Sequence, residues 1–334
     1  IIDDLKTGKI DIVIGTHRLL QKDVALNDLG LLVPDEEQRF GVKHKEKLKR
    51  LKSTVDVLAL TATPIPRTLV LTHFGDMAVT QLTDKPAGRQ TIDTAILPIS
   101  EFDRVVARLR TRIAQGAQAY WVCPLVEESE TLDVISAQDR FNVLESTFGK
   151  QVGLVHGRLS SSDKQNAMDR FINGELKILV ATTVIEVGVD VPNASIMIVE
   201  HAERFGLSQL HQLRGRVGRG AAKSACLLLY KAPLGETASA RLETIRDSDD
   251  GFEIAERDME LRGHGDVLGT RQSGMPGYHL AVPDVHRHLL EWAHEDAAEI
   301  MRSNPALTGG RGEALRALLY TFRRDQAIAL IRAG

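Results

Sequence analysis

Two arginines flanked by glycines are the residues in this sequence best suited to chemistry on a charged ligand. Arg216 and Arg219 lie three positions apart in the segment QLRGRVGRG, residues 212–220. If a helix ends near Leu213, the glycines let the backbone turn tightly and both arginines reach the same side of the turn. Guanidinium groups stay charged and offer a planar fork of donors, so the pair can neutralise a transferring phosphoryl group. The pattern predicts a polyphosphate site, although an exposed Gly-Arg turn with solvated charges has the same composition.

An acidic cluster after an aliphatic run is the second candidate. Residues 29–33 have the pattern of a buried strand, and Asp35 and Glu36 follow one residue later. At the end of a parallel strand, Asp35 can hold Mg²⁺ through water, while Glu36 can orient and polarise an attacking water. Such clusters also arise by chance in a chain that is 26% charged. The Thr-Ala-Thr sequence at residues 61–63, after another aliphatic run, favours the catalytic interpretation.

A loop with a cation beside a glycine is the third candidate. His156 and Arg158 flank Gly157 directly after the strand pattern of residues 151–155. This arrangement is suited to contact with a phosphate backbone, and it is also typical of an exposed turn.

The elements that position these residues alternate between strand and helix patterns, which predicts an α/β fold with parallel sheets. The expected strands are residues 10–14, 29–33, 55–60, 92–97, 117–123, 151–155, 176–182, 195–200 and 225–230. Helices are expected over 43–52, 102–114, 137–147 and 162–173, then a helical hairpin over 237–246 and 251–261, then helices over 285–301 and 312–330. Ligands bind at the carboxyl ends of parallel strands, where the candidate residues fall.

Composition limits the class of protein. A formal net charge of −3 excludes a uniformly basic nucleic-acid surface, so contact with DNA must come from local patches. Cys123 and Cys226 lie in aliphatic runs and are expected to be buried thiols, with no disulfide or zinc site. No apolar run approaches the roughly 18 residues that a membrane helix needs, and no signal peptide is recognisable, so we expect a cytoplasmic protein without membrane contact.

Several segments resemble the motifs of superfamily 2 helicases. DEEQRFGV at 35–42 and TATPIPRTL at 61–69 are similar to motifs II and III, and ATTVIEVGVD at 181–190 and HQLRGRVGRG at 211–220 to motifs V and VI. The resemblance implies tandem RecA-like helicase domains that use ATP and Mg²⁺. It places the nucleotide at Gln212, Gly188 and Asp190. GTH at residues 15–17 is similar to motif Ib, and the DNA backbone contacts implied are Thr16, His17, His156, Arg158 and Thr183.

From about residue 86 onward the chain resembles the RecG family of bacterial branch-migration helicases, through AYWVCPLVEESE, GLVHGRL and RDSDDGFEIAERDMELRGHGDVLGTRQSG. The last segment is similar to the translocation hairpin shared with the transcription-repair coupling factor. In that element a helical hairpin and its loop couple motor closure to movement along double-stranded DNA. By position Arg262, Arg271 and Gln272 carry that role, and the Gly-Thr-Arg-Gln form favours RecG. Residues 1–65 look closer to the coupling factor. Pro34 departs from both families, in which an aliphatic or acidic residue normally precedes the motif II aspartate, and a proline there removes a donor from the strand ladder.

The resemblance also implies a domain division and a function. Residues 1–85 are expected to be the later part of a first RecA-like domain, 86–233 a second RecA-like domain, and 234–334 the hairpin with its following helices. No G-x-x-x-x-G-K-[ST] loop occurs, so we expect the chain to begin within its first domain and to be inactive alone. The implied function is ATP hydrolysis driving branch migration or fork reversal in DNA recombination and repair, by a monomer that binds branched junctions and stalled forks. The alternatives are a transcription-repair coupling translocase and an ATPase-inactive DNA-binding module.

Overall fold

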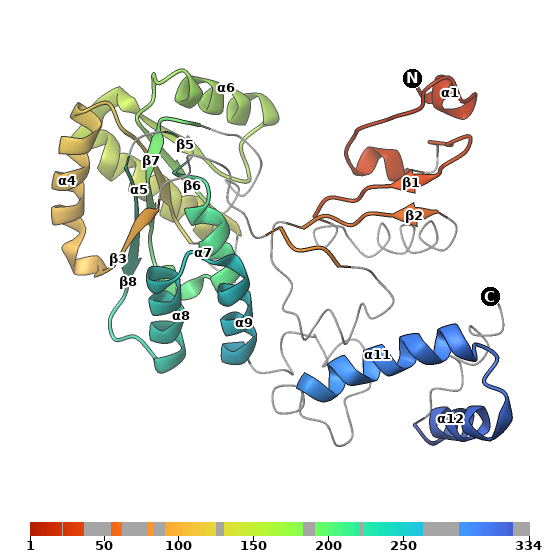
Figure 1. The fold of residues 1–334 in the computed structure, drawn as a ribbon. Helices are drawn as coiled ribbons and strands as arrows, with labels where there is room; N and C mark the ends of the chain where they lie inside the picture. The colour runs from red at the N-terminus through yellow and green to blue at the C-terminus, as the bar shows by residue number, and fades with distance from the viewer. Residues whose placement is uncertain are drawn as a thin grey trace. The chain divides into compact units, whose positions relative to one another are not determined.

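The computed structural model describes residues 1–21, 23–36, 55–61, 79–82, 91–124, 130–182, 191–218, 220, 223–262 and 287–322. The helix expected over 43–52 lies outside these residues. The chain divides into two compact units, Ile1–Pro64 and Ile65–Gly334, each described by itself (Figure 1). The domain boundary expected after residue 85 also falls outside the described residues and stays a prediction.

The described part of the first unit contains a short parallel strand pair. Helix α1 (Ile2–Lys6) and the 3₁₀ helix η1 (His17–Leu20) precede strands β1 (Leu31–Leu32) and β2 (Asp56–Val57). Leu31 pairs with Asp56 and Leu32 with Val57, in parallel. The strands predicted over 29–33 and 55–60 are therefore confirmed, although each is shorter.

The strand predicted over residues 10–14 is wrong. These residues form no strand, and the side chains of Ile12 and Ile14 are 82% and 94% exposed. A β-branched run becomes a strand only where a neighbouring backbone pairs with it. Within the part of this unit that the structure describes, only β1 and β2 make such a sheet.

Pro34 does not end the pairing of β1 with β2, contrary to the concern raised by its missing N–H. The Pro34 carbonyl accepts from the Leu60 N–H at 2.9 Å, and the Glu36 N–H donates to the Leu60 carbonyl at 3.0 Å. Asp35 and Leu60 form a parallel bridge between these two bonds. The proline contributes only an acceptor, and the ladder continues to the acidic pair.

The second unit contains a six-stranded parallel sheet with the order β3-β8-β7-β4-β6-β5. The strands are β3 (Ile92–Pro98), β4 (Gln118–Val122), β5 (Val152–Val155), β6 (Ile178–Ala181), β7 (Ala194–Val199) and β8 (Ser224–Tyr230). All six predicted strands of this part are confirmed. Short apolar runs between helical patterns predicted them correctly because a central parallel strand is buried on both faces.

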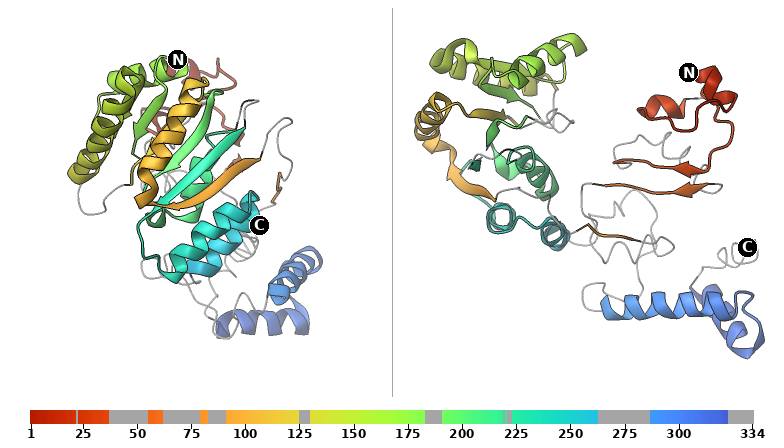
Figure 2. Two further views of the ribbon diagram at one scale, coloured as in Figure 1. Left: turned by 90° about the vertical axis from the view of Figure 1, so that its left-hand side faces the viewer. Right: turned by 45° about the horizontal axis from the view of Figure 1, so that its top comes forward.

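Helices cover both faces of this sheet (Figures 1 and 2). Helices α4 (Phe102–Ala114) and α5 (Glu130–Phe148) pack on one face, where strand residues such as Ala119 and Trp121 join their core. Helices α6 (Ser161–Ile172) and α7 (Leu207–Arg214) pack on the other face, where Tyr120 and Val122 point. The alternation along β4 follows from the two-residue period of a strand. The predicted helix over 137–147 is confirmed and begins earlier, at Glu130.

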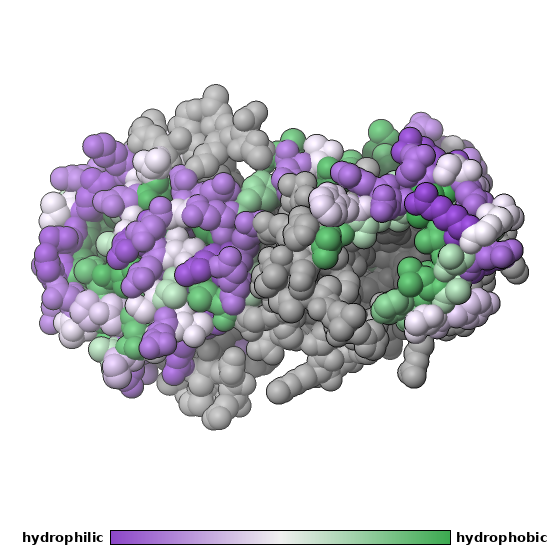
Figure 3. Space-filling view, turned by 60° about the horizontal axis from the view of Figure 1, so that its bottom comes forward, coloured by the Kyte–Doolittle hydropathy of each residue, from purple (hydrophilic) through white to green (hydrophobic). Residues whose placement is uncertain are grey.

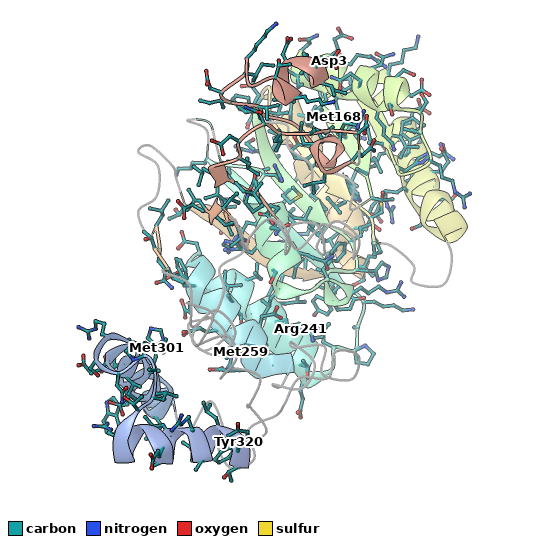
Figure 4. The ribbon with its side chains drawn as sticks, turned by 90° about the vertical axis from the view of Figure 1, so that its right-hand side faces the viewer. Asp3, Met168, Arg241, Met259, Met301 and Tyr320 are labelled. Atoms are coloured by element: carbon teal, nitrogen blue, oxygen red, sulfur yellow. The ribbon has the colours of Figure 1, made fainter. Side chains whose placement is uncertain are left out.

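Two helices follow β8 and form the predicted hairpin. Helix α8 (Glu236–Asp247) and helix α9 (Gly251–Arg262) pack on each other, and Ile245 and Ile254 join the same core as α7. Figure 4 labels Arg241 on α8 and Met259 on α9. The Asp250 carboxylate accepts from the Phe252 N–H at 2.8 Å and so caps the start of α9.

Helices α11 (Arg287–Ser303) and α12 (Gly309–Thr321) are the last described elements. The predicted helix over 285–301 is confirmed, whereas α12 ends at Thr321, and residues 323–330 of its predicted extent lie outside the described part. Both helices expose apolar side chains, including Met301 and Tyr320, which Figure 4 labels. On the surface shown in Figure 3, hydrophobic residues are interspersed with hydrophilic ones. None of the described helices is long and apolar enough to cross a membrane.

Candidate nucleotide and DNA site

Helix α7 begins after the carboxyl end of β7 and leads the first candidate cluster back to the amino ends of the strands, not to the carboxyl edge expected from the sequence: a Cβ on Gly218 would lie 3.0 Å from Ile92, the first residue of β3. The helix follows β7 and a 3₁₀ turn, η6 (Ala202–Arg204), and ends at Arg214, one residue beyond the predicted end. Leu207, Leu210 and Leu213 are fully buried against the sheet. Burial of this apolar face fixes the rotation of the helix, so Gln212 and Arg216 stay partly buried at its end.

The glycines after α7 are required by the backbone. Gly218 has φ of +80°, a left-handed conformation that is costly for other residues. A Cβ on Gly220 would lie 2.4 Å from the Pro192 carbonyl oxygen. The predicted tight turn is confirmed, and the close approach that Gly220 permits is to the backbone of Pro192. Arg219 lies outside the described residues, so its position beside Arg216 stays a prediction.

Sequence reasoning missed Arg214, which lies between Gln212 and Arg216, two of the ligand-binding residues expected in this segment. Its side chain is 3% exposed and donates to the carbonyl oxygens of Ile245 and Ser248, the latter at 2.8 Å. These carbonyls belong to the end of α8, whose last turn has unsatisfied acceptors. A third contact joins Arg214 Nη2 and His211 Nδ1 at 3.1 Å. Arg214 thus connects α7 to the hairpin, and only its place in the QLRGR motif could have suggested a role.

A second contact joins α7 to the other hairpin helix. Ser208 Oγ, in the first turn of α7, donates to Asp258 Oδ2 of α9 at 3.3 Å. Asp258 is buried, and a buried polar group is costly without a hydrogen bond. Helix α7 is therefore attached to α9 near its start and to α8 near its end.

His156 and Thr182 lie side by side at the carboxyl edge of β5 and β6. Val155 pairs with Ala181, and the Thr182 N–H donates to the Val155 carbonyl at 3.3 Å. Both side chains are buried, and among the described residues neither His156 Nδ1 nor Thr182 Oγ1 has a hydrogen-bond partner. Burial and the nearby cations Lys164 and Arg158 lower the pKa of His156, which favours the neutral imidazole.

The loop after β5 has the exposed cation that the sequence predicted. Arg158 is exposed, and Lys164 Nζ donates to the Gly157 carbonyl at 2.7 Å. Ser160 caps helix α6 by accepting from the Asp163 N–H at 3.1 Å. The sequence also named Thr183, which lies outside the described residues, whereas its neighbour Thr182 is the threonine whose hydroxyl is buried at this edge.

In the first unit, the acidic pair lies directly after the β1 ladder. Asp35 is exposed and Glu36 is partly buried, with a left-handed φ of +52°. A non-glycine residue in this region is strained, and such strain clusters at functional sites. Thr16 caps η1 by accepting from the Arg18 N–H at 3.4 Å, while Arg18 pairs with Asp23. The side chain of His17 is not described.

Six of the predicted site residues lie outside the described residues: Thr183, Gly188, Asp190, Arg219, Arg271 and Gln272. The side chain of Arg262, at the end of α9, is also not described. Among the residues that the structure does describe, no group of three acidic, histidine or cysteine side chains could form a metal cage.

The matches to family models follow these elements in order. A DEAD/DEAH box helicase model matches residues 1–71, a helicase conserved C-terminal domain matches 101–221, and a model described as "ATP-dependent DNA helicase RecG, domain 3, C-terminal" matches 248–326. The parallel sheet, the glycine-arginine turn after α7 and these matches together place the chain in the class of proteins with tandem RecA-like helicase domains.

Similar proteins specify the family. ATP-dependent DNA helicase RecG of Bacillus subtilis is 47% identical over 306 residues, which are 91% of this chain and 45% of that protein. RecG of Acidithiobacillus ferridurans is 49% identical over 302 residues, 90% of this chain and 44% of that protein. A solved structure described as RecG bound to a three-way DNA junction is 42% identical, with a TM-score of 0.64, over 87% of this chain and 37% of that chain. The chain belongs to the RecG family. It spans less than half the length of these relatives.

Proposed function

We propose that this chain contributes to an ATP-dependent helicase that acts on branched DNA, in branch migration or fork reversal. The relatives are named ATP-dependent DNA helicases, and one solved relative is described as bound to a three-way DNA junction. The chain spans about 45% of the Bacillus subtilis relative, so the activity of the whole protein is part of the proposal.

One observation carries this proposal. The helix that presents Gln212 and leads to Arg216 is attached to both helices of the hairpin, through Arg214 to Ser248 and through Ser208 to Asp258. A change at the nucleotide that moves α7 therefore also moves α8 and α9. Such a connection is what a motor needs to convert hydrolysis into movement along DNA.

The acidic pair supports a magnesium–nucleotide site. Carboxylate oxygens are hard ligands, and proteins commonly hold Mg²⁺ through one or two carboxylates, with water and substrate phosphates completing the coordination. Asp35 is exposed at the end of a parallel ladder and suits this role. When bound, the ion would neutralise charge on the phosphates. Glu36 would hold and orient the attacking water.

The arginines and the remaining site residues have distinct roles in this proposal. Arg216 and Arg219 would stabilise charge that develops on the γ-phosphoryl oxygens. Gln212, Gly188 and Asp190 would hold the nucleotide. The DNA contacts would come from the loop and motif residues Thr16, His17, His156, Arg158 and Thr183, from Arg262 at the end of the hairpin, and from Arg271 and Gln272, which follow the hairpin in the sequence.

The experiment is ATP hydrolysis by the complete gene product that contains these 334 residues, with and without a three-way DNA junction. A rate of ATP hydrolysis that rises when the junction is added supports the proposal. Junction binding without any hydrolysis rejects the proposed enzymatic activity. The same assay on the 334 residues alone decides whether they suffice for hydrolysis. We expect no turnover there, because the sequence has no phosphate-binding loop of the G-x-x-x-x-G-K-[ST] type.

The missing loop also favours a second candidate for these 334 residues by themselves, an ATPase-inactive DNA-binding module. Its test is binding of the junction by the 334 residues without nucleotide. We further propose that the protein is a monomer, which analytical ultracentrifugation with and without the junction would decide.

A further inference from the structure

A buried carboxylate lies directly after the central strand β7, away from the residues discussed above. Glu200 is 5% exposed, and its backbone N–H extends the sheet by donating to the Val122 carbonyl at 2.9 Å. Its side chain accepts from the Trp121 indole Nε1 at 2.5 Å. A buried carboxylate is costly unless it is paired, so its partners must be strong.

Arg140 of α5 supplies the compensating charge. Its Nη2 donates to Glu200 Oε2 at 3.0 Å, and its Nε forms an ion pair with Glu200 Oε1. The guanidinium stacks over the Phe102 ring, with Cζ 4.2 Å from the ring centroid. Phe102 also packs edge-on against Trp121, with the two ring centroids 5.6 Å apart. Arg140 is thus held in one orientation by an anion on one side and an aromatic ring on the other.

The segment after Glu200, residues 201–206, leads directly into α7. His201 adopts a left-handed φ of +49°, and its Nδ1 lies 3.0 Å from Glu203 Oε1. Glu203 Oε2 also accepts from the Lys231 N–H at 3.3 Å, which attaches the segment to the end of β8. Phe205 is buried in the same core as α7. The six residues therefore have little freedom, and the direction in which they leave Glu200 determines where α7 begins.

We propose that Glu200 and Arg140 are positioning residues for α7: their buried ion pair fixes the end of β7, and thereby sets where Gln212 and Arg216 lie. This inference rests on the proposed function, since it assigns a purpose to the position of Arg216. A buried ion pair adds little net stability compared with apolar packing, but its directional bonds specify one arrangement. Arg140 belongs to α5, which packs on the face of the sheet opposite to α7. The ion pair therefore makes the position of α7 depend also on a helix across the sheet.

The test uses Glu200→Gln, which keeps an oxygen to accept from Trp121 and removes the charge that Arg140 requires. Glu175→Gln is the matched control, because Glu175 pairs with Arg170 on the protein surface. In the gene product, Glu200→Gln should lower kcat for junction-stimulated ATP hydrolysis by about a hundredfold and leave KM for ATP nearly unchanged. A loss of this size is expected when a catalytic group such as Arg216 is misplaced by about an ångström. The Arg140→Gln/Glu200→Gln double variant should lose less than the product of the two single losses.

A second readout does not depend on activity. Amide hydrogen exchange of residues 207–214 should become about tenfold faster in Glu200→Gln and stay unchanged in Glu175→Gln. A tenfold change is what the loss of roughly one charge-assisted hydrogen bond would cause. The emission of Trp121, isolated as the difference between each protein and its Trp121→Phe counterpart, reports the disturbance at Glu200 directly. Unchanged exchange in α7 despite a shifted Trp121 emission would overturn the inference, and so would an unchanged kcat in an active protein. A wild-type protein without turnover would reject the proposed function, while the exchange measurement would still decide the inference.

Discussion

Arg214, in the last turn of α7, donates a hydrogen bond of 2.8 Å to the carbonyl oxygen of Ser248, the residue directly after α8. This bond joins the segment expected to bind phosphates to the hairpin expected to move along DNA. Arg214→Ala should lower the free energy of unfolding by about 2–4 kcal/mol, because it removes a buried cation and leaves carbonyls of α8 unsatisfied. Urea denaturation measures this loss. Arg246→Ala is the control, since Arg246 is an exposed residue of α8, and it should change stability by less than about 0.5 kcal/mol. Equal losses in both variants would contradict the buried role of Arg214.

Arg216→Ala should abolish junction-stimulated ATP hydrolysis by the gene product and leave junction binding largely intact. An arginine that stabilises the transferring phosphoryl group is worth about 10³–10⁵ in rate. Turnover and electrophoretic mobility shifts measure the two properties separately. Arg204→Ala provides a matched change at an exposed arginine of the segment before α7, and it should leave turnover within about twofold. Retained turnover in Arg216→Ala would remove this residue from the mechanism.

Gly218→Ala should destabilise the second unit by about 1–3 kcal/mol, because alanine is strained at φ of +80°. The added Cβ would also lie 3.0 Å from Ile92 Cγ1. Thermal unfolding followed by circular dichroism measures the change. Gly157→Ala meets no atom within 4 Å and has no positive φ, so it should be close to neutral. A neutral Gly218→Ala would mean that the turn after α7 can relax.

The buried His156 should make stability depend on pH. Its folded pKa lies below the ordinary value of 6.5, so the unfolded chain binds more protons in the interval between these two pKa values. Stability should therefore fall as pH decreases from about 6.5 toward the folded pKa, and level off below it. Urea midpoints measured from pH 8 to pH 5 test this. His156→Gln should flatten the pH profile in that interval, and an unchanged slope would assign it to other groups.

Both cysteines should be unreactive in the folded protein. Burial raises the pKa of Cys226 to about 12, and burial together with the charge of Glu200 raises the pKa of Cys123 further. The thiolate is the nucleophile, so a disulfide reagent at pH 8 should label neither thiol in the native state and both in denaturant. Cys226→Ser should leave one thiol reactive in denaturant. Rapid labelling of the native protein would show that the sheet opens.

The sequence by itself determined the α/β class, the strands and helices of the second unit and the hairpin. Those predictions depend on local patterns, because a run such as residues 195–200 is apolar enough to be a doubly buried strand whatever its neighbours are. Glycines at 218 and 220 likewise indicate a tight turn, since other residues do not fit a left-handed φ or a close backbone approach. The family resemblance rests on these same local segments.

Only the tertiary structure decided which residues meet. The run at residues 10–14 has the composition of a strand, yet it forms none, because strand formation requires a pairing partner that composition does not specify. Arg214 meets Ser248, 34 positions away, and Trp121 meets Glu200, 79 positions away. The first contact follows from the packing of α7 on α8, and the second from the pairing of β4 with β7. Which residues meet depends on how strands and helices pack in the fold, and the local spacing of residue types does not encode that packing.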